Sequence, residues 1–223
     1  MTDRPIPFSP DMMRAVLREI AALGTGKTQT RRIPKLRGYP GFFQFGRSDT
    51  PGYDWTFRRR DHVWEDFRHH ELLPRLQYAI GDRLWVREAW KADVEWDDTP
   101  PRELDDADSV LYLADGFYAP GMWGDPFTAG KYRPPMFMPR WASRVTLIVT
   151  DVKVERVQEI SVDDAIAEGR PAREEFLSGR RWFRTLWDSL NAKRGFGWDA
   201  NPWVIAVTFR PVMGNIDQIG EAA

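Results

Sequence analysis

The fold of this chain is predicted mainly from the stretch Gly24-Thr-Gly-Lys-Thr-Gln-Thr-Arg-Arg32. An amphipathic helix should precede it, because Ser9 can act as N-cap, Pro10 can occupy the first helical turn, and apolar residues recur at helical spacing up to Leu23. The glycines end that helix. The Thr-rich residues that follow predict a turn running into a strand, so Lys27 should stand at the start of that strand.

The glycine turn superficially resembles a phosphate-binding loop. That motif requires a further glycine where Ala21 stands, and a strand rather than a helix before the loop. No apolar strand that ends in an aspartate is visible to hold Mg²⁺. The sequence therefore does not indicate an NTPase.

Outside this stretch the sequence predicts short strands and few helices. Strands are expected at residues 4–8, where two prolines indicate an edge, at 83–88, at 110–114, as a pair over 143–157 with a bend near Asp151, and at 203–212. Helices are expected at 63–72 after a hairpin near Trp55, at 161–168 with a capping box, and at about 174–191. The tail after Met213 is expected to be loose. Because strands and helices do not alternate, a doubly wound parallel sheet is not expected.

Composition restricts the class of protein. The chain has 223 residues, 42% hydrophobic and 29% charged, so we expect one globular domain, 1–223, with insertions at about 38–78 and 92–134. The net charge of -1 gives the molecule no overall attraction to nucleic acid or membranes. The absence of cysteine excludes disulfides, thiol catalysis and cysteine zinc sites. No signal peptide or membrane-spanning stretch is visible, so we expect a cytoplasmic protein.

Two residue types leave alternatives open. The three histidines lie in the first insertion, at His62, His69 and His70. None of them is spaced from another as paired metal ligands on one helix face are, so we expect neither a metal nor another cofactor. The eleven tryptophans either fill the core or line a pocket where a flat ring stacks.

Lys27 and the residues after it form the strongest candidate site. Burial lowers the pKa of a lysine, so a buried Lys27 could act as a base or activate a neighbouring hydroxyl. On an extended segment Thr28 and Thr30 share one face, opposite Gln29 and Arg31. The alternative is a plain surface strand.

Glu88 is a second candidate. It stands between Trp85 and Trp90, near arginines, at the end of a predicted strand. It is either one half of a structural ion pair or a residue that lines a pocket.

The order of these segments resembles the ASCH family of PUA-like proteins, and especially the ASCH-like proteins that phages and prophages encode. The matching stretches are Arg4-Pro-Ile-Pro-Phe-Ser9, Gly26-Lys-Thr-Gln-Thr-Arg-Arg32, Gly81-Asp-Arg-Leu-Trp-Val-Arg-Glu88, Met138-Pro-Arg-Trp-Ala-Ser143 and Gly197-Trp-Asp-Ala-Asn-Pro-Trp203. The resemblance covers most of the chain outside the insertions. It implies an α+β fold, a PUA-like mixed β-barrel with flanking short helices and large loop insertions.

The resemblance also implies functional residues. The smallest enzymes of the family are N4-acetylcytidine amidohydrolases, whose site combines a lysine and a threonine of the Lys-Thr-x-Thr segment with a glutamate that ends a short helix. By position these look like Lys27, Thr30 and Glu168, which we expect to be catalytic. The lysine would activate the threonine, and the glutamate would hold the base or shuttle a proton. Substrate binding is expected at Thr28, Arg31, Arg32, Trp85, Glu88, Trp90, Arg140 and Trp141.

Three functions remain open. The first is an amidohydrolase that removes an acyl group from a modified cytosine nucleoside or base. The second is a non-catalytic module that binds RNA or a modified base, with stacking rings at Trp90, Trp123 and Trp141 and phosphate contacts at Arg31, Arg32 and Arg140. The third is a ribonuclease. The expected partner is a modified nucleoside or single-stranded RNA or DNA.

Overall fold

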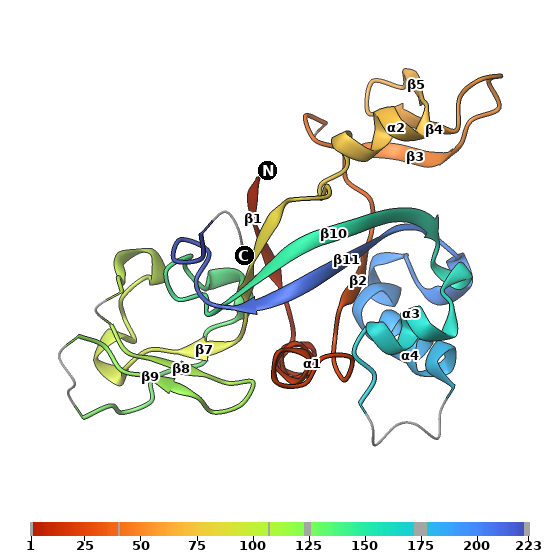
Figure 1. Cartoon of the computed structure of the whole chain (residues 1–223). Coiled ribbons are helices and arrows are strands. Elements are labelled where there is room, and N and C mark those ends of the chain that lie inside the picture. The colour runs from red at the N-terminus through yellow and green to blue at the C-terminus, as the bar shows by residue number, and fades with distance from the viewer. Residues whose placement is uncertain (1, 40, 107, 123–125, 172–177, 221–223) are drawn as a thin grey trace. The chain divides into compact units, whose positions relative to one another are not determined.

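The computed structural model describes residues 2–39, 41–106, 108–122, 126–171 and 178–220 (Figure 1). Trp123 and the predicted helix start near Glu174 lie outside these residues. The described chain is a mixed α+β structure in which sheets dominate and helices are few and short. This confirms the α+β class.

The chain divides into two compact units, each described by itself. Unit 1 comprises Met1–Thr28, Asp82–Ile148 and Arg210–Ala223, and unit 2 comprises Gln29–Gly81 and Val149–Phe209. Two strands run through both units, namely β10 (Val145–Arg156) and β11 (Trp203–Met213). The single domain expected over 1–223 stays a prediction.

In unit 1 the main sheet has the strand order β1-β6-β10. Strand β1 (Asp3–Pro7) pairs in parallel with β6 (Arg83–Arg87), with Ile6 opposite Val86. The first residues of β10 pair antiparallel with β6. The position of β1 at the edge explains how it accommodates two prolines, since a proline has no N–H for a ladder hydrogen bond. Both predicted strands are confirmed.

Helix α1 (Pro10–Ala21) begins where it was predicted to begin. The side chain of Ser9 accepts a hydrogen bond from the backbone N–H of Met12 and caps the helix. The buried face of α1 carries apolar residues such as Val16, but also Glu19, which is only 5% exposed. An acidic residue on an apolar face needs hydrogen-bond partners.

A second sheet of unit 1 has the order β7-β8-β9, drawn in yellow to green in Figure 1. Its short antiparallel strands are β7 (Trp90–Lys91), β8 (Val110–Tyr112) and β9 (Tyr118–Ala119). Trp90 and Tyr112 lie opposite each other and belong to one hydrophobic cluster of buried side chains. Residues of the region predicted as the second insertion therefore share a packed core with residues on either side of it, such as Trp90 and Met138.

The segment after β11 is anchored, so the prediction of a loose tail is wrong for its described part. Ile216 is completely buried. The side-chain amide of Asn215 donates to the backbone carbonyls of Arg140, Trp141 and Ser143 at 2.8, 2.9 and 2.8 Å. The loose tail was predicted from its terminal position alone. A single polar residue such as Asn215, which binds a distant loop, leaves no periodic pattern in the sequence that could indicate the anchor.

In unit 2 the main sheet has the order β10-β11-β2. Strand β2 (Gln29–Arg32) pairs antiparallel with β11, and Thr30 lies opposite Val207. The predicted turn that runs into a strand after Lys27 is confirmed.

Strand β10 differs from the pair of strands predicted over residues 143–157. It is one continuous strand, but its burial pattern does change phase. Val149 and Val152 are buried, while the adjacent residues Thr150 and Asp151 are both exposed. The alternation of apolar residues predicted the change of phase correctly, and a change of phase does not require the strand to end.

Two helices of unit 2, α3 (Val162–Ala167) and α4 (Gly179–Asn191), pack side by side (Figure 1). Ser161 caps α3, as predicted. Gly179 permits the close packing, because a Cβ added there would lie 3.2 Å from the Cβ of Ala165.

Unit 2 also contains an antiparallel sheet in the order β3-β4-β5. Its strands are β3 (Phe42–Arg47), β4 (Trp55–Arg59) and β5 (Trp64–Phe67), and α2 (His69–Leu72) follows. The helix predicted over 63–72 is wrong in its first half, which pairs with β4 as a strand. Cross-strand pairing decided the structure of a segment whose sequence has no clear period.

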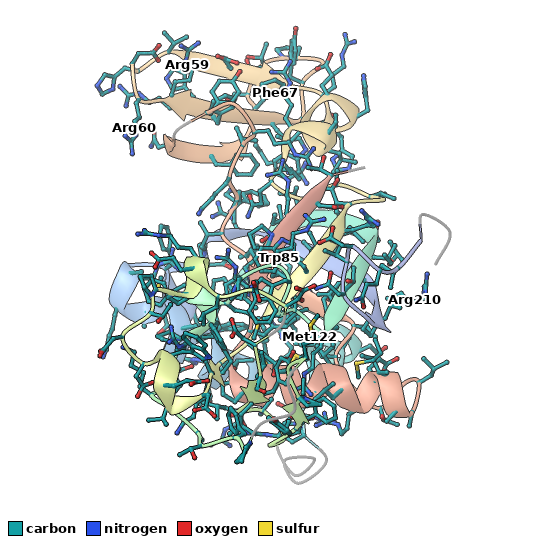
Figure 2. The ribbon with its side chains drawn as sticks, turned by 90° about the vertical axis from the view of Figure 1, so that its left-hand side faces the viewer. Arg59, Arg60, Phe67, Trp85, Met122 and Arg210 are labelled. Atoms are coloured by element: carbon teal, nitrogen blue, oxygen red, sulfur yellow. The ribbon has the colours of Figure 1, made fainter. Side chains whose placement is uncertain are left out.

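The hairpin predicted near Trp55 is confirmed by β3 and β4. Trp55, Phe57 and Phe67 are buried on one face of this sheet, and the rings of Phe57 and Phe67 stack at 5.3 Å. Figure 2 shows Arg59 and Arg60 toward one end of the same sheet, where β4 ends. The first predicted insertion therefore also has ordered structure with its own apolar side.

The closed barrel that was expected is not present in the described residues. The strand order of the main sheet ends at β1 and at β2, so the sheet is open. The alternating strands predicted a sheet correctly, but closure depends on pairing between strands far apart in the sequence.

Across the part of the chain that the structure describes, no helix combines the length and apolar character needed to cross a membrane. Short 3-10 helices occur at η1 (Leu73–Arg75), η2 (Val94–Trp96), η3 (Pro101–Glu103), η4 (Pro135–Phe137), η5 (Val157–Glu159), η7 (Ala192–Arg194) and η8 (Trp198–Ala200).

Candidate functional site

The candidate site of unit 2 is centred on the guanidinium of Arg31. Its Nε donates to Oε1 of Glu155 at 2.9 Å, and its Nη2 lies 2.6 Å from the same oxygen. Nη2 also donates to Oδ2 of Asp164 at 3.1 Å. Nη1 donates to Oε1 of Gln29 at 2.6 Å and to Oε1 of Glu168 at 3.2 Å. We call these five residues the Arg31 cluster.

Different elements place the members of the Arg31 cluster. Gln29 and Arg31 are two positions apart on β2, so their side chains leave the same face of the strand. Asp164 lies in the first turn of α3, where its backbone N–H donates to the hydroxyl of Ser161, and Glu168 is the C-cap of the same helix. Asp164 and Glu168 are four positions apart, which puts both carboxylates on one helix face. A strand and a helix thus present their polar faces to each other.

The cluster contains more carboxylates than cations. Three carboxylates surround one guanidinium, and Lys153 adds a second positive charge, with its Nζ 2.5 Å from Oε2 of Glu155. The hydrogen bond to Glu155 raises the pKa of Lys153. Burial by itself would raise the pKa of Asp164, but the charge of Arg31 and the hydrogen bonds to this carboxyl outweigh burial and keep the pKa below its usual value.

Arg31 is engaged by protein groups on all three of its nitrogens. Its side chain is 0% exposed, and the guanidinium lies 5.6 Å from the ring centroid of Phe183. A phosphate or a developing oxyanion could bind Arg31 only by displacing a carboxylate. The geometry therefore makes Arg31 a residue that orients Glu168 and Asp164 rather than one that faces a substrate.

The three residues expected to be catalytic are all buried. Lys27 and Thr30 are each 1% exposed, and Glu168 is 3% exposed. Thr30 and Glu168 belong to unit 2, where Arg31, the neighbour of Thr30, contacts Glu168 directly. Lys27 belongs to unit 1, and its Nζ lies 5.6 Å from the ring centroid of Phe8. The alternative of a plain surface strand is wrong for this stretch.

The glycine turn before Lys27 is held by a buried carboxylate that the sequence analysis missed. Oε1 of Glu19 accepts the backbone N–H of Gly24 at 2.9 Å, and Oε2 accepts that of Gly26 at 2.8 Å. A Cβ at Gly26 would lie 2.2 Å from the carbonyl oxygen of Ala15. In a phosphate-binding loop such N–H groups face the phosphate, whereas here a protein carboxylate occupies them. The sequence does contain one signal of this carboxylate, because Glu19 is an acidic residue on the apolar face of the predicted helix.

Glu88 forms a buried ion pair in unit 1. Nε and Nη2 of Arg144 donate to its two carboxylate oxygens at 2.8 and 2.9 Å. Arg144 also donates to Asp115, and its guanidinium lies 4.1 Å from the ring centroid of Tyr112. Burial raises the pKa of Glu88, and the bonds from Arg144 oppose that rise. This geometry matches the structural alternative, and the partner stands 56 positions away, where no local pattern could indicate it.

The tryptophans expected to bind substrate in unit 1 are packed within the protein. Trp90 is 0% exposed and so offers no ring surface for stacking. Trp85 is 6% exposed, and the guanidinium of Arg87 lies 4.4 Å from its ring centroid. The indole N–H of Trp141 donates to the backbone carbonyl of Leu104 at 3.0 Å. These rings contribute to the core.

The remaining residues expected to bind substrate also have protein partners or partial burial. Arg140 donates to Asp3 and Asp217, each at 2.6 Å. Arg32 is half-buried and its Nη1 donates to the preceding backbone carbonyl. Thr28 is half-buried as the last residue of unit 1. The side chain of Arg140 is still 37% exposed, although its charge is paired with two carboxylates.

The described residues contain no group of three or more His, Cys, Asp or Glu side chains that could hold a metal ion. The carboxylates of the Arg31 cluster surround a guanidinium instead. His69, in the predicted histidine region, accepts a hydrogen bond at its Nδ1 from the indole N–H of Trp55 at 3.1 Å.

Comparison with known proteins adds no relative. No protein-family model matches the chain, and no curated protein and no solved structure shows significant similarity to it. Function is therefore inferred from the residues and their geometry.

Proposed function

We propose that this chain is an amidohydrolase that removes an acyl group from the exocyclic nitrogen of a modified cytosine nucleoside or base. One observation supports it most: the carboxylate of Glu168 is 3% exposed and accepts a hydrogen bond from Arg31 at 3.2 Å. A carboxylate that is shielded from water and held in place can transfer a proton in a defined direction. Glu168 also occupies the position at which the resemblance to the ASCH family implies the catalytic glutamate. A PUA-like identity of the fold is part of this proposal.

Thr30 is the proposed nucleophile. Its hydroxyl oxygen attacks the carbonyl carbon of the acyl group, and a base accepts the hydroxyl proton. The carboxylate of Glu168 takes this proton from the base and passes it to the exocyclic nitrogen, so that the carbon–nitrogen bond breaks and the nitrogen leaves as the amine. Water hydrolyses the acyl-threonine ester, which releases the carboxylic acid and restores the hydroxyl. Lys27 enters as the base through the resemblance alone.

Arg31 is a positioning residue in this reaction. Because its nitrogens are engaged by the cluster, it acts on the reaction through Glu168. An Arg31→Lys variant keeps a positive charge but loses the planar fork that fixes several carboxylates at once. We expect it to lower kcat while KM stays within about two-fold, since loss of an interaction made only in the transition state leaves ground-state binding intact. A loss of folded protein would also lower the apparent kcat without changing KM, so kcat is normalised to the folded fraction measured by circular dichroism.

The test is hydrolysis of N4-acetylcytidine and related acyl-cytosines by the purified chain, followed by chromatography of the released cytidine. Glu168→Gln keeps the shape and an acceptor for Arg31 but cannot accept a proton and pass it on, and we expect a loss of about 100-fold or more. Lys27→Met should have a comparable effect. Arg184→Lys, on the exposed face of α4, is the matched control and should retain full activity. No turnover of any acyl-cytosine, or full activity of Glu168→Gln, would contradict the proposal.

A further inference from the structure

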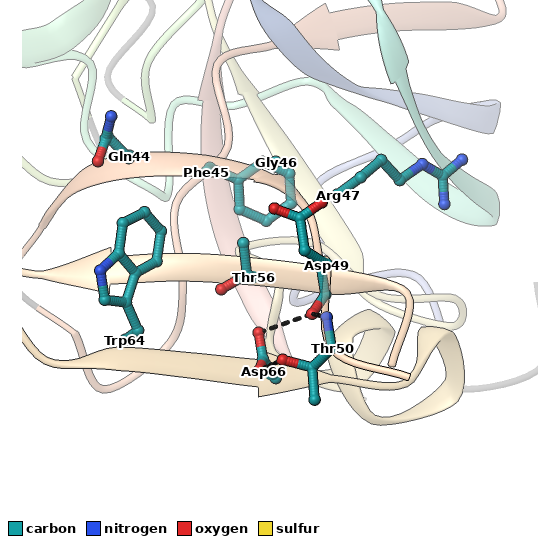
Figure 3. Close-up of a pocket in the computed structure, with 10 residues that line it drawn as sticks. Gln44, Phe45, Gly46, Arg47, Asp49, Thr50, Thr56, Trp64 and Asp66 are labelled. Atoms are coloured by element: carbon teal, nitrogen blue, oxygen red, sulfur yellow. Dashed lines mark hydrogen bonds between the residues drawn. The ribbon is translucent and has the colours of Figure 1, made fainter. Parts of the chain in front are cut away.

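An open pocket of about 380 Å³ lies on the β3-β4-β5 sheet of unit 2 (Figure 3). This volume falls in the range of small-ligand sites. The pocket is formed by the face opposite to buried Trp55 and Phe57. Thr56 forms part of its lining, with Gly46 opposite it in the register. No residue of the Arg31 cluster lines the pocket.

Trp64 and Asp66 project from the same strand toward the pocket (Figure 3). Trp64 is 53% exposed, although an indole of this size is usually covered in a folded protein. The two residues are two positions apart on β5, so their backbones are separated by roughly 7 Å along one face. A flat ring that stacks on the indole would therefore present one edge to the carboxylate of Asp66.

The carboxylate of Asp66 is fixed in orientation. The hydroxyl of Ser48 donates to Oδ1 at 2.9 Å, and that of Thr50 donates to Oδ2 at 2.7 Å. The two oxygens together can accept about four hydrogen bonds, and the hydroxyls of Ser48, Thr50 and Thr56 use three of these positions, so one remains for a donor from a ligand. The hydrogen bond from Thr50, with those from Thr56 and Ser48, also keeps the pKa of Asp66 below its usual value. The group is thus ionised and acts only as an acceptor near neutral pH.

Charge distinguishes between ligand classes. Asp49 and Asp66 line the pocket together with Arg47, whose guanidinium packs 4.1 Å from the ring centroid of Trp55, so the two carboxylates weigh against binding of a phosphate. Arg58 lies beside the indole, with its guanidinium 5.8 Å from the ring centroid of Trp64, and its Nε is buried without a hydrogen-bond partner among the described residues. The cation strengthens stacking of a polarisable flat ring on this platform. The site therefore favours an uncharged aromatic ring over a phosphate chain.

We propose that the β3-β4-β5 sheet carries a second binding site, which holds an uncharged nucleobase stacked on Trp64 with an N–H donor on its edge bonded to Asp66. Guanine fits best, because either of two adjacent N–H groups on one edge can donate to the acceptor position that remains on the carboxylate. Uracil fits worst, since its single edge N–H is flanked by carbonyl oxygens that face the carboxylate. The site is separate from the Arg31 cluster and does not depend on the proposed hydrolysis.

The test measures binding of guanosine, uridine and methyl glucopyranoside to the full chain by saturation-transfer NMR titration. Guanosine should bind at least about five-fold more tightly than uridine, and Trp64→Ala should weaken guanosine binding by about five-fold or more, as expected for the loss of one stacked base. Asp66→Asn should remove the preference for guanosine over uridine. Tyr53→Ala is the matched control: this ring is 40% exposed in the connection between β3 and β4 but does not line the pocket, and its loss should leave binding unchanged.

Three results would overturn the site: guanosine binding by Trp64→Ala within two-fold of wild type, equal weakening by Tyr53→Ala, or binding of the glucopyranoside in place of guanosine. Because Trp64 is exposed, the Trp64→Ala variant should fold, and a thermal unfolding curve checks this. Hydrolysis of acyl-cytosines by Trp64→Ala should remain at the wild-type level. Failure of this site and failure of the proposed hydrolysis are therefore distinguishable.

Discussion

Nη1 of Arg31 lies 3.2 Å from Oε1 of Glu168, although the two residues stand 137 positions apart in the sequence. The contact joins β2 to the end of α3, and both side chains are almost completely buried. Removing either partner leaves the other charge in a place where water cannot compensate for it. The relationship therefore concerns the stability of unit 2 as well as the orientation of Glu168.

Arg31→Met should lower the free energy of unfolding by about 3–5 kcal/mol, because it leaves buried carboxylates without their cation. Urea unfolding followed by circular dichroism measures this. Arg184→Met is the control, since Arg184 pairs with an exposed Asp199 and should lose no more than about 1 kcal/mol. Equal losses for the two variants would show that the Arg31 cluster contributes no more than a surface ion pair.

Asp164 should make stability depend on pH in the acid range. Its pKa in the folded chain lies below the ordinary value of 3.8, so its ionised form stabilises the fold at pH values above that ordinary value. This contribution is lost as the pH falls through the lowered pKa. We expect wild type to exceed Asp164→Asn in stability at pH 6 and this difference to shrink below about pH 4. Urea unfolding of both proteins from pH 6 to pH 2.5 measures it, and a difference that stays constant over this range would contradict the assignment.

Gly26→Ala should destabilise the protein more than Gly24→Ala. At Gly26 the added Cβ meets backbone atoms at 2.2 and 2.3 Å, which no side-chain rotation relieves, so we expect a loss of about 3 kcal/mol. At Gly24 there is open space, and the cost is the positive φ of 79°, about 1–2 kcal/mol. Gly220→Ala, with open space and no positive φ, should be neutral. Thermal unfolding of the three variants would refute this if it gave the reverse order.

Asn215→Ala should cost about 1–2 kcal/mol, because three backbone carbonyls lose their shared donor. The exposed side chain of Gln218 provides the control, and Gln218→Ala should change stability by no more than about 0.5 kcal/mol. Limited proteolysis offers a second readout, since release of the anchored tail should expose residues near the C-terminus to early cleavage. An unchanged cleavage pattern in Asn215→Ala would argue against the anchor.

The elements that the sequence predicted correctly are those set by neighbouring residues. Ser9 and Ser161 cap their helices through bonds to residues three positions away, so a short motif was sufficient. In the main sheet, alternation of polar and apolar residues indicated β6 and β10. Strand β5 was predicted as a helix because it has no clear period and becomes a strand through its pairing with β4.

The candidate site was predicted only in part, and the missing part is long-range. Lys27, Thr30 and Glu168 were singled out and are all buried. The saturation of Arg31 by carboxylates was not foreseen, because one partner, Glu155, stands 124 positions away. The same holds for Arg144 beside Glu88. Ion pairs that close large loops leave no trace in spacing or composition.

The wide sequence separation of the Arg31 cluster has a consequence for the order of folding events. Its contacts join β2 to β10 and α3, so they close loops of more than a hundred residues, which carries an entropic cost before any contact forms. We expect the cluster to form after the transition state of folding. Arg31→Met should then accelerate unfolding while leaving the refolding rate nearly unchanged. Stopped-flow measurements would place the cluster earlier if refolding slowed instead. Accelerated unfolding, the result we expect, would mean that this buried network determines how long the native state persists.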